Sequence, residues 1–269
     1  MGGSTESGVR RMAVPKIIWS LWLQGWDSAS DLVRTCAASW SRLNPGWEVR
    51  HLTKTHVDQL FFNAASNTHL LERDIPPEAL SDVVRLELLA RYGGVWADAT
   101  TYCLAPLDEW LGPAVASGFF AFDRLGPDRM LSTWFLAADI PSPVISRWRD
   151  LTKAYWAVRT ERDAYFWAHY LFAKAYETDD EVRCIWDSTP KISADGPHSF
   201  VPYQETLFGP VTDRARSIVE TAPFPMLKLT HNLRPIVRDY VALYQWLCDR
   251  EHNLKVANES VESWVGILI

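Results

Sequence analysis

Three short segments of the sequence carry side chains that could act on a polar ligand. Asp82 and Arg85 stand three residues apart, so a helix through them would present both on one side, where they could hold hydroxyl groups. Asp98 is an acid in an otherwise apolar run, and burying it is costly unless it meets a cation or several hydrogen-bond donors. The segment 228–231 (KLTH) adds a lysine and a histidine late in the chain. These three segments are the candidates for chemistry.

Each segment also has an ordinary structural explanation. Asp82 and Arg85 could form a helix-surface ion pair, which contributes only about 0.2–0.5 kcal/mol. Asp98 could cap the turn after its strand. A single histidine, such as His231 or His169, is more often a structural residue than a ligand. Spacing alone leaves both explanations open for every one of these residues.

The sequence patterns around these residues predict strands and helices that together indicate an α/β sheet. Residues 14–23 are β-branched and aromatic like a buried strand, the apolar positions over 32–43 recur at helical spacing, and 47–52 alternate like a second strand. This strand–helix–strand start is typical of an α/β fold. A helix over 79–92 ends at a glycine pair, and 95–102 predict a strand that carries Asp98 at its middle or end. Asp98 would then lie where α/β sheets bind ligands.

No linker or internal repeat divides the chain, so we expect a flexible tail over 1–12 and a single domain over 13–269. Further elements are expected as strands over 118–122, 132–138 and 226–230, helices over 144–158, 164–176 and about 236–248, and a long loop over 187–223.

The composition excludes several classes of protein. Of the 269 residues, 48% are hydrophobic and 22% are charged, as in an ordinary soluble globular protein, so wholesale disorder is excluded. The net charge is −6 and no run of lysine or arginine stands out, which argues against nucleic-acid binding. No stretch approaches the roughly 18 apolar residues of a membrane span. The four cysteines lack metal-binding or dense disulfide spacing, and we interpret them as reduced thiols of a cytoplasmic protein.

Several motifs in a fixed order carry a resemblance to a known family. They are 14–19 (VPKIIW), 44–47 (NPGW), the S-D-x-x-R motif of 81–85, 92–100 (YGGVWADAT) and 228–230 (KLT). In this order they resemble the capsular polysaccharide synthesis family, which is related to the DXD sugar-binding-motif glycosyltransferases of family 32. The resemblance extends over roughly residues 14 to 235, and 81–100 is its most specific part. It implies a GT-A fold, in which a nucleotide-binding α/β sheet carries acceptor-binding elements.

The resemblance also implies roles for individual residues. Asp82 and Arg85 match the aspartate and the arginine that contact hydroxyl groups of the donor sugar in related enzymes. Asp98 matches the first Asp of D-x-D, which contacts the donor and lies beside the metal. Thr100 replaces the second Asp, normally the metal ligand, and this weakens a Mg²⁺ or Mn²⁺ site because these ions prefer carboxylates. His231 is the expected further metal ligand beside Asp98, and imidazole favours Mn²⁺.

Six residues are expected to bind the nucleotide-sugar donor. The chain holds 14 tryptophans, whose faces could stack on a sugar or a base, although core packing explains most tryptophans in proteins. Trp19 and Trp22 are the candidates for the base, with core packing as the alternative for each. Lys228 is the candidate for meeting the charge of the departing diphosphate. The full donor-binding set is Trp19, Trp22, Gly94, Thr100, His169 and Lys228.

The implied reaction transfers a sugar from a UDP- or GDP-sugar to an acceptor hydroxyl, with retention of configuration and with Mn²⁺ or Mg²⁺. The acceptor is a glycan, a lipid-linked sugar or a small molecule. Two alternatives remain open. A catalytically silent family member would bind a nucleotide sugar or glycan without turnover, and Thr100 favours this alternative. A glycoside hydrolase would pair Asp82 with Asp98 across the scissile bond, but no sequence signature supports it.

Overall fold

A five-stranded mixed sheet lies at the centre of the computed structural model, which describes residues 14–62, 75–123, 126–234, 236 and 239–265. Its strands are β1 (Ile17–Leu21), β2 (Glu48–Leu52), β3 (Gly94–Ala97), β5 (Phe119–Asp123) and β6 (Leu131–Ala138). Their order is β2-β1-β3-β6-β5, with β1 parallel to β2 and β3, and β6 antiparallel to β3 and β5. A second sheet pairs β4 (Thr101–Cys103) with β7 (Met226–Lys228) in antiparallel fashion. The expected tail over 1–12 lies outside the described residues.

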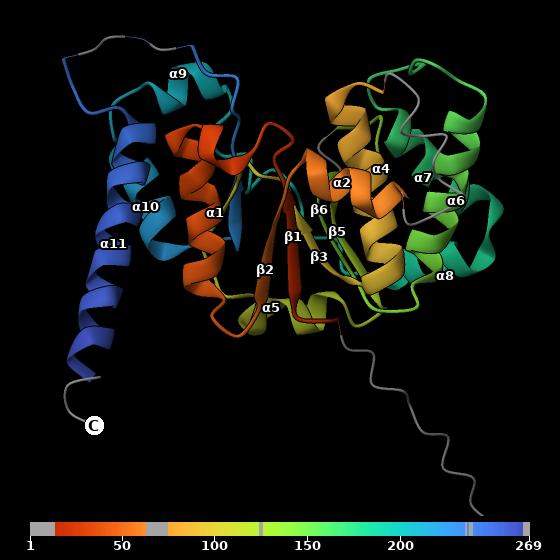
Figure 1. Cartoon of the computed structure of the whole chain (residues 1–269), viewed down its shortest axis with the longest axis horizontal. Coiled ribbons are helices and arrows are strands. Elements are labelled where there is room, and N and C mark those ends of the chain that lie inside the picture. The colour runs from red at the N-terminus through yellow and green to blue at the C-terminus, as the bar shows by residue number, and fades with distance from the viewer. Residues whose placement is uncertain (1–13, 63–74, 124–125, 235, 237–238, 266–269) are drawn as a thin grey trace, which may run out of the picture.

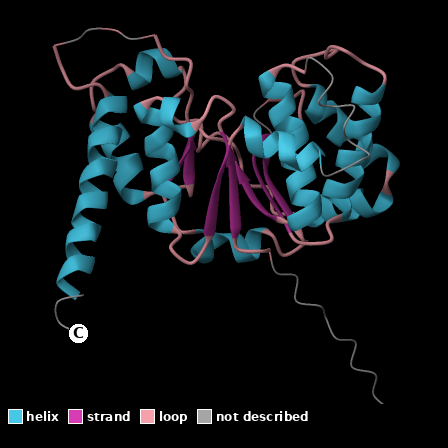
Figure 2. Cartoon of the chain, in the orientation of Figure 1, coloured by secondary structure: helices cyan, strands magenta, loops and turns pink. Residues whose placement is uncertain are grey.

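Helices flank the central sheet on both sides (Figures 1 and 2). On one side α1 (Asp31–Leu43) packs against α11 (Leu243–Val265), near α9 (Tyr203–Leu207) and α10 (Asp213–Thr221). The other side carries α2 (Lys54–Phe62), α4 (Pro77–Tyr92), α6 (Pro143–Ala157), α7 (Trp167–Thr178) and α8 (Asp180–Ser188), and α5 (Leu107–Ala114) lies below the strands in Figure 1. The expected α/β fold is confirmed.

The two faces of the sheet bury different sets of apolar side chains, because successive residues of a strand point to opposite faces. Trp19 of β1 and Trp96 of β3 belong to the hydrophobic cluster that includes residues of α4 and α6. Ile18 and Val95 belong to a second cluster with Trp40 of α1 and residues of α5. All five side chains are almost completely buried. Apolar packing on both faces therefore fixes β1 and β3.

A tight connection leads from α4 into β3. Pro77 begins α4, where the missing N–H of proline costs no helical hydrogen bond. Gly93 and Gly94 follow the helix with φ angles of +61° and +93°, a region that favours glycine. A Cβ atom at Gly94 would lie 2.6 Å from the Ile17 carbonyl oxygen, so no side chain fits there between β3 and β1. β3 therefore runs directly beside β1 and delivers Asp98 at its end.

The structure corrects the expected strand over 95–102. β3 ends at Ala97, and a turn over 98–100 separates it from β4. The Thr101 N–H and hydroxyl both donate to the Asp98 carbonyl oxygen, at 2.9 and 2.7 Å, and these two hydrogen bonds close the turn. Asp98 consequently lies at the end of a strand rather than within one.

Other boundaries differ because short helices show little periodic pattern. The expected loop over 187–223 contains α9 and α10, and Thr212 begins α10 by accepting the Ala215 N–H at 3.1 Å. The short helices α2, α5 and α8 have no counterpart among the elements expected from the sequence. The last helix, expected over about 236–248, begins at Leu243 and extends to Val265. Neither this helix nor another in the described ranges has the length and apolar character that crossing a bilayer requires.

Candidate active site

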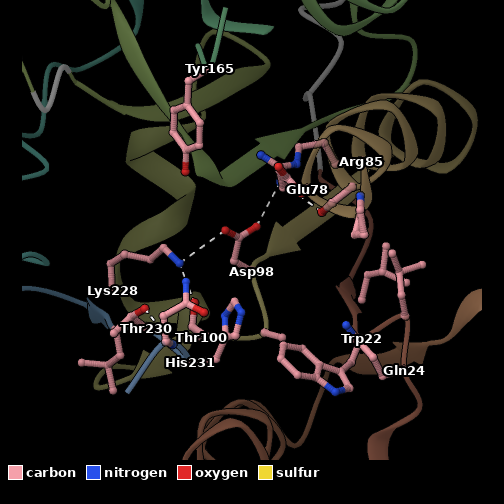
Figure 3. Close-up of a pocket in the computed structure, with 17 residues that line it drawn as sticks. Trp22, Gln24, Glu78, Arg85, Asp98, Thr100, Tyr165, Lys228, Thr230 and His231 are labelled. Carbon is pink, nitrogen blue, oxygen red and sulfur yellow. Dashed lines mark hydrogen bonds and ion pairs between the residues drawn. The ribbon is translucent and has the colours of Figure 1, made fainter. Parts of the chain in front are cut away.

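A cavity of about 360 Å³ lies at the carboxyl ends of β1 and β3. Residues 21–24 at the end of β1 and residues 98–100 after β3 form part of its wall, which is where α/β sheets commonly bind ligands. The start of α4 and the end of β7 complete the wall, and Tyr165 extends into the cavity from the opposite side (Figure 3). The lining includes Trp22, Gln24, Glu78, Ser81, Arg85, Asp98, Thr100, Tyr165, Lys228, Thr230 and His231.

Asp98 lies between two cations in this cavity (Figure 3). Its Oδ1 is 2.9 Å from the Trp96 indole nitrogen and 3.2 Å from Arg85 Nη2, and its Oδ2 is 3.4 Å from Lys228 Nζ. Burial raises the pKa of this carboxyl group, but Arg85 and Lys228 outweigh that effect, so the pKa of Asp98 is lowered. Asp98 is therefore an ionised carboxylate at neutral pH, held in place by fixed donors.

Arg85 is a buried cation that two acids share. Its side chain is only 6% exposed, and its Nη1 is 2.8 Å from Asp82 Oδ1 and 2.8 Å from the Thr133 carbonyl oxygen. Its Nη2 contacts Asp98. Burial raises the pKa of Asp82 to about 6 even though Arg85 is adjacent. Asp82 itself is not among the residues that line the cavity, so the structure connects it to the site through Arg85.

The small sheet brings Lys228 to the turn after β3. Thr101 of β4 lies opposite Lys228 of β7, and the Leu229 N–H donates to the Thr100 carbonyl oxygen at 2.8 Å. Lys228 Nζ also donates to Thr100 Oγ1, at 2.5 Å. The ammonium group consequently contacts both Asp98 and Thr100. The residue in the place of the second Asp of D-x-D is thus a hydrogen-bond acceptor for a lysine.

Trp22 and His231 meet at the part of the cavity nearest β1. Their rings pack edge to face with centroids 5.3 Å apart. Burial and the nearby Lys228 lower the pKa of His231, against the raising effect of Asp98. The imidazole is therefore neutral at pH 7. Of the two tryptophans considered for the base, the structure brings only Trp22 to the cavity.

Tyr165 is a cavity residue that the sequence analysis did not identify. It is 68% exposed, and its hydroxyl group points into the cavity (Figure 3). The Arg162 guanidinium lies 5.2 Å from the centre of its ring and pairs with Glu78 at 2.7 Å, which connects Tyr165 to the start of α4. The aromatic run 165–167 contains no signal that separates Tyr165 from its neighbours. Ser81, which accepts from Arg85 Nη2 at 3.2 Å, could have been found from its motif.

Three residues of the expected donor-binding set, Trp19, Gly94 and His169, do not line this cavity. Trp19 is in the core, where its indole N–H donates to the Gly93 carbonyl oxygen at 3.0 Å, so its faces are not available to a base. Gly94 allows β3 to approach β1 and forms no part of the cavity wall. His169 lines a second cavity of about 450 Å³. Burial lowers its pKa to about 3, so it is a neutral, partly buried residue.

The residues of the site do not fit a divalent metal ion. Mg²⁺ and Mn²⁺ prefer carboxylate oxygens, and the expected ligands offer one carboxylate, Asp98, which already contacts Arg85 and Lys228. A metal ion between Asp98 and Thr100 would lie beside the Lys228 ammonium group, which repels it. His231 could supply one neutral nitrogen. Across the described ranges, His, Cys, Asp and Glu nowhere gather in groups of three that could hold a metal ion.

The fold and the site define an α/β protein with a charged cavity at the ends of two parallel strands. The chain belongs to the family described as "Capsular polysaccharide synthesis protein", whose sequence profile matches residues 5–242. This result confirms the family resemblance seen in the sequence motifs.

Curated relatives in three fungi have names that describe sugar transfer. The chain is 29% identical over 159 residues to "O-glycosyltransferase braB" of Annulohypoxylon truncatum, and this match covers 52% of this chain and 38% of that protein. It is 26% identical over 177 residues to "O-glycosyltransferase PaGT" of Phomopsis amygdali, and this match covers 60% of this chain and 43% of that protein. "Glycosyltransferase afumC" of Aspergillus fumigatus is 26% identical to the chain over 162 residues, and this match covers 52% of this chain and 40% of that protein. The chain thus spans about two fifths of the length of the curated relatives it matches.

Two solved structures are similar to the chain. "PaToxG Glycosyltransferase" has a TM-score of 0.43 and 12% identity, and the match covers 77% of this chain and 84% of that one. An active-site mutant of LgtC has a TM-score of 0.40 and 12% identity, and the match covers 90% of this chain and 95% of that one.

Proposed function

We propose that this protein is a GT-A-type glycosyltransferase that moves a sugar from a nucleotide-diphosphate donor to an acceptor hydroxyl. The observation that carries the proposal is the position of Asp98, which lies between Arg85 and Lys228 in the cavity at the ends of β1 and β3. A carboxylate accepts hydrogen bonds from sugar hydroxyls, and the ammonium group of Lys228 suits diphosphate oxygens. Membership of the family, and relatives named as O-glycosyltransferases, support the proposal.

In the proposed reaction, the bond between the anomeric carbon and the diphosphate oxygen breaks, and its electron pair leaves with the diphosphate. The acceptor oxygen bonds to the same face of that carbon, so configuration is retained, and the acceptor proton passes to the departing diphosphate oxygen. Positive charge develops on the sugar ring as the leaving group departs. Asp98 and Arg85 hold the sugar hydroxyls, Asp82 positions Arg85 through their 2.8 Å ion pair, and Lys228 faces the diphosphate.

Two aromatic residues on opposite walls of the cavity are proposed to contact the donor base and the acceptor. Trp22 is the proposed stacking surface for the base of a UDP- or GDP-sugar, because it lines the cavity and Trp19 does not. Tyr165, on the opposite wall, is proposed for the acceptor, which is a glycan, a lipid-linked sugar or a small molecule. The Mn²⁺ or Mg²⁺ expected from the sequence takes no step in this proposal because the residues do not fit it.

We also propose that residues 13–269 form one domain, because α1 and α11, from opposite ends of the chain, pack together beside the same sheet. A cytoplasmic location fits the four cysteines, which are free thiols in the structure.

Turnover of UDP-, GDP- and TDP-sugars by the wild type and by Asp98→Asn tests the function. Asparagine keeps the shape of the side chain but removes its charge, so turnover should fall by about 10²-fold or more. Asp108→Asn is the matched control, because Asp108 is an exposed acid paired with Lys16 away from the cavity. Wild-type turnover by Asp98→Asn would reject the site assignment.

A catalytically silent donor-binding protein is the second candidate. The observation that favours it is Thr100, a neutral residue in the place of the second acid of D-x-D. Such a protein would bind a nucleotide sugar in calorimetric titration and would release no free sugar or transfer product. Sugar release or transfer by the wild type that Asp98→Asn loses would exclude this candidate.

A further inference from the structure

We propose that the ammonium group of Lys228, and not a divalent metal ion, supplies the positive charge that meets the donor diphosphate. The inference rests on the proposed function, because it assigns a role within transfer from a nucleotide-diphosphate donor. It concerns the turn over 98–100, where the sequence resemblance places a metal ion.

The position of Lys228 carries the inference. Its Nζ lies 3.4 Å from Asp98 Oδ2 and 2.5 Å from Thr100 Oγ1, so a cation already contacts both polar side chains of the D-A-T segment (Figure 3). In a D-x-D segment these two positions would be the carboxylates beside the metal ion. Here the same two positions hold an ammonium group that belongs to the chain itself.

Thr100 fits this arrangement better than an acid would. A hydroxyl oxygen accepts a hydrogen bond from the ammonium group without neutralising its charge. An aspartate at position 100, together with Asp98, would surround Lys228 with two carboxylates and leave little positive charge for a phosphate. Replacement of the second acid therefore preserves the charge of Lys228 for the ligand.

Lys228 also has hydrogen-bonding capacity left for a phosphate oxygen. An ammonium group has three N–H donors, and Thr100 and Asp98 are the two partners of Lys228 Nζ within the described residues. Arg85 differs, because Asp82 at 2.8 Å and Asp98 at 3.2 Å share its charge. Lys228 is thus better placed than Arg85 to take a new anionic partner, and lysine is a common phosphate ligand.

The backbone holds Lys228 in place before any ligand arrives. Its own N–H donates to the Pro197 carbonyl oxygen at 2.9 Å, and the next N–H, that of Leu229, donates to Thr100 at 2.8 Å. The side chain is 17% exposed and lines the cavity, so its charge is partly shielded from water. Fixed charges in partly dehydrated sites stabilise a departing anion more than the same charges in water.

Calorimetric titration of UDP, GDP and TDP in EDTA and in Mn²⁺ tests the inference on the wild-type protein. The dissociation constant of the nucleotide that binds should agree within about twofold between the two conditions. Lys228→Met should raise that constant about tenfold or more in both conditions, since it removes a charge-assisted hydrogen bond. Lys16→Met is the matched control, because Lys16 is an exposed lysine paired with Asp108 outside the cavity and should bind like the wild type.

A double variant tests the exchange of lysine for metal directly. Thr100→Asp combined with Lys228→Ala restores the two carboxylates of D-x-D and removes the ammonium group. It should bind the nucleotide only when Mn²⁺ is present, which reverses the wild-type behaviour. Thermal melting checks that each variant is folded, and the wild-type comparison between EDTA and Mn²⁺ needs no variant at all.

The outcomes separate this inference from the proposed function. Nucleotide binding by the wild type that requires Mn²⁺ would overturn the role of Lys228 and leave the proposed function standing. An unchanged dissociation constant for Lys228→Met would overturn it as well. Absence of binding by UDP, GDP and TDP in both conditions would overturn the inference and the proposed function together.

Discussion

Arg85 Nη2 lies 3.2 Å from Asp98 Oδ1, and this contact joins α4 to the turn after β3. The Arg85 guanidinium also pairs with Asp82 and lies 5.1 Å from the centre of the Trp96 ring. The position of Asp98, which lines the cavity, thus depends on a side chain that is almost fully buried. Stability of the fold and integrity of the site are consequently linked through Arg85.

Arg85→Ala is expected to reduce both stability and donor binding. It leaves Asp82 and Asp98 without their shared cation, and removal of one partner from a buried ion pair costs about 3–5 kcal/mol. Urea denaturation measures the loss in the free energy of unfolding, and calorimetry measures nucleotide binding.

The matched control for that variant is Arg91→Ala on the same helix. Arg91 pairs with the buried Glu87, which keeps a second partner, Lys153, at 3.2 Å after the substitution. A stability loss for Arg85→Ala no larger than that for Arg91→Ala would contradict the role of Arg85 as a shared cation.

The raised pKa of Asp82 predicts that this residue makes the fold less stable as the pH rises. Its pKa is about 6 in the fold and 3.8 in the unfolded chain, so between these values the folded protein keeps a proton that the unfolded chain has lost. The free energy of unfolding therefore decreases between about pH 4 and pH 6, by on the order of 3 kcal/mol for this group.

Urea denaturation of the wild type and of Asp82→Asn over this pH range isolates the effect. Asp98, whose lowered pKa acts in the opposite direction, is present in both proteins and largely cancels in the difference. The wild type should lose stability relative to Asp82→Asn as the pH rises. A difference that does not change with pH would show that the Asp82 pKa is not raised.

Tyr165→Ala is expected to weaken binding of the acceptor. Its exposed ring forms the wall of the cavity opposite Trp22, and loss of an aromatic contact should raise the KM for the acceptor about tenfold while leaving donor hydrolysis little changed. Tyr170→Ala, which removes another exposed tyrosine that does not line the cavity, should leave both unchanged. Equal KM values for the two variants would remove Tyr165 from the acceptor site.

Gly94→Ala is expected to destabilise the fold strongly. The added Cβ would meet the Ile17 carbonyl oxygen at 2.6 Å, and the φ of +93° alone strains a non-glycine residue by about 1–3 kcal/mol. Gly46→Ala provides the comparison, because no atom lies within 4 Å of its added Cβ, and its effect should stay within about 0.5 kcal/mol. Thermal melting measures both, and similar melting temperatures would show that β3 can move away from β1.

The sequence predicts best those parts of the site that are close together in the chain. Arg85 lies on α4, and Asp98 comes directly after β3, the strand that follows this helix, so their separation in the chain is short. The residue types of 228–231 make Lys228 a candidate, but only the family resemblance gives it a role, because β4 and β7 are three-residue strands from distant segments and carry little pattern.

Side-chain direction at strand ends was harder to predict. Trp19 and Trp22 are three residues apart in one apolar run, and only the end of β1 at Leu21 decides that the first packs in the core and the second lines the cavity. Tyr165 lies in the aromatic run 165–167, and the structure leaves it exposed, with Arg162 against its ring. The packing of Trp19 against distant parts of the chain, which no local pattern encodes, decides its position.

The pairing of β4 with β7 also orders the events by which the site is made during protein synthesis. The chain leaves the ribosome from its N-terminus, so Arg85 and Asp98 are available well before Lys228. Until residues 226–228 emerge, β4 has no partner strand and Asp98 lacks its second cation. A nascent chain that ends before β7 therefore carries the acid without the lysine, and the proposed recognition of a diphosphate must wait until the late segment docks.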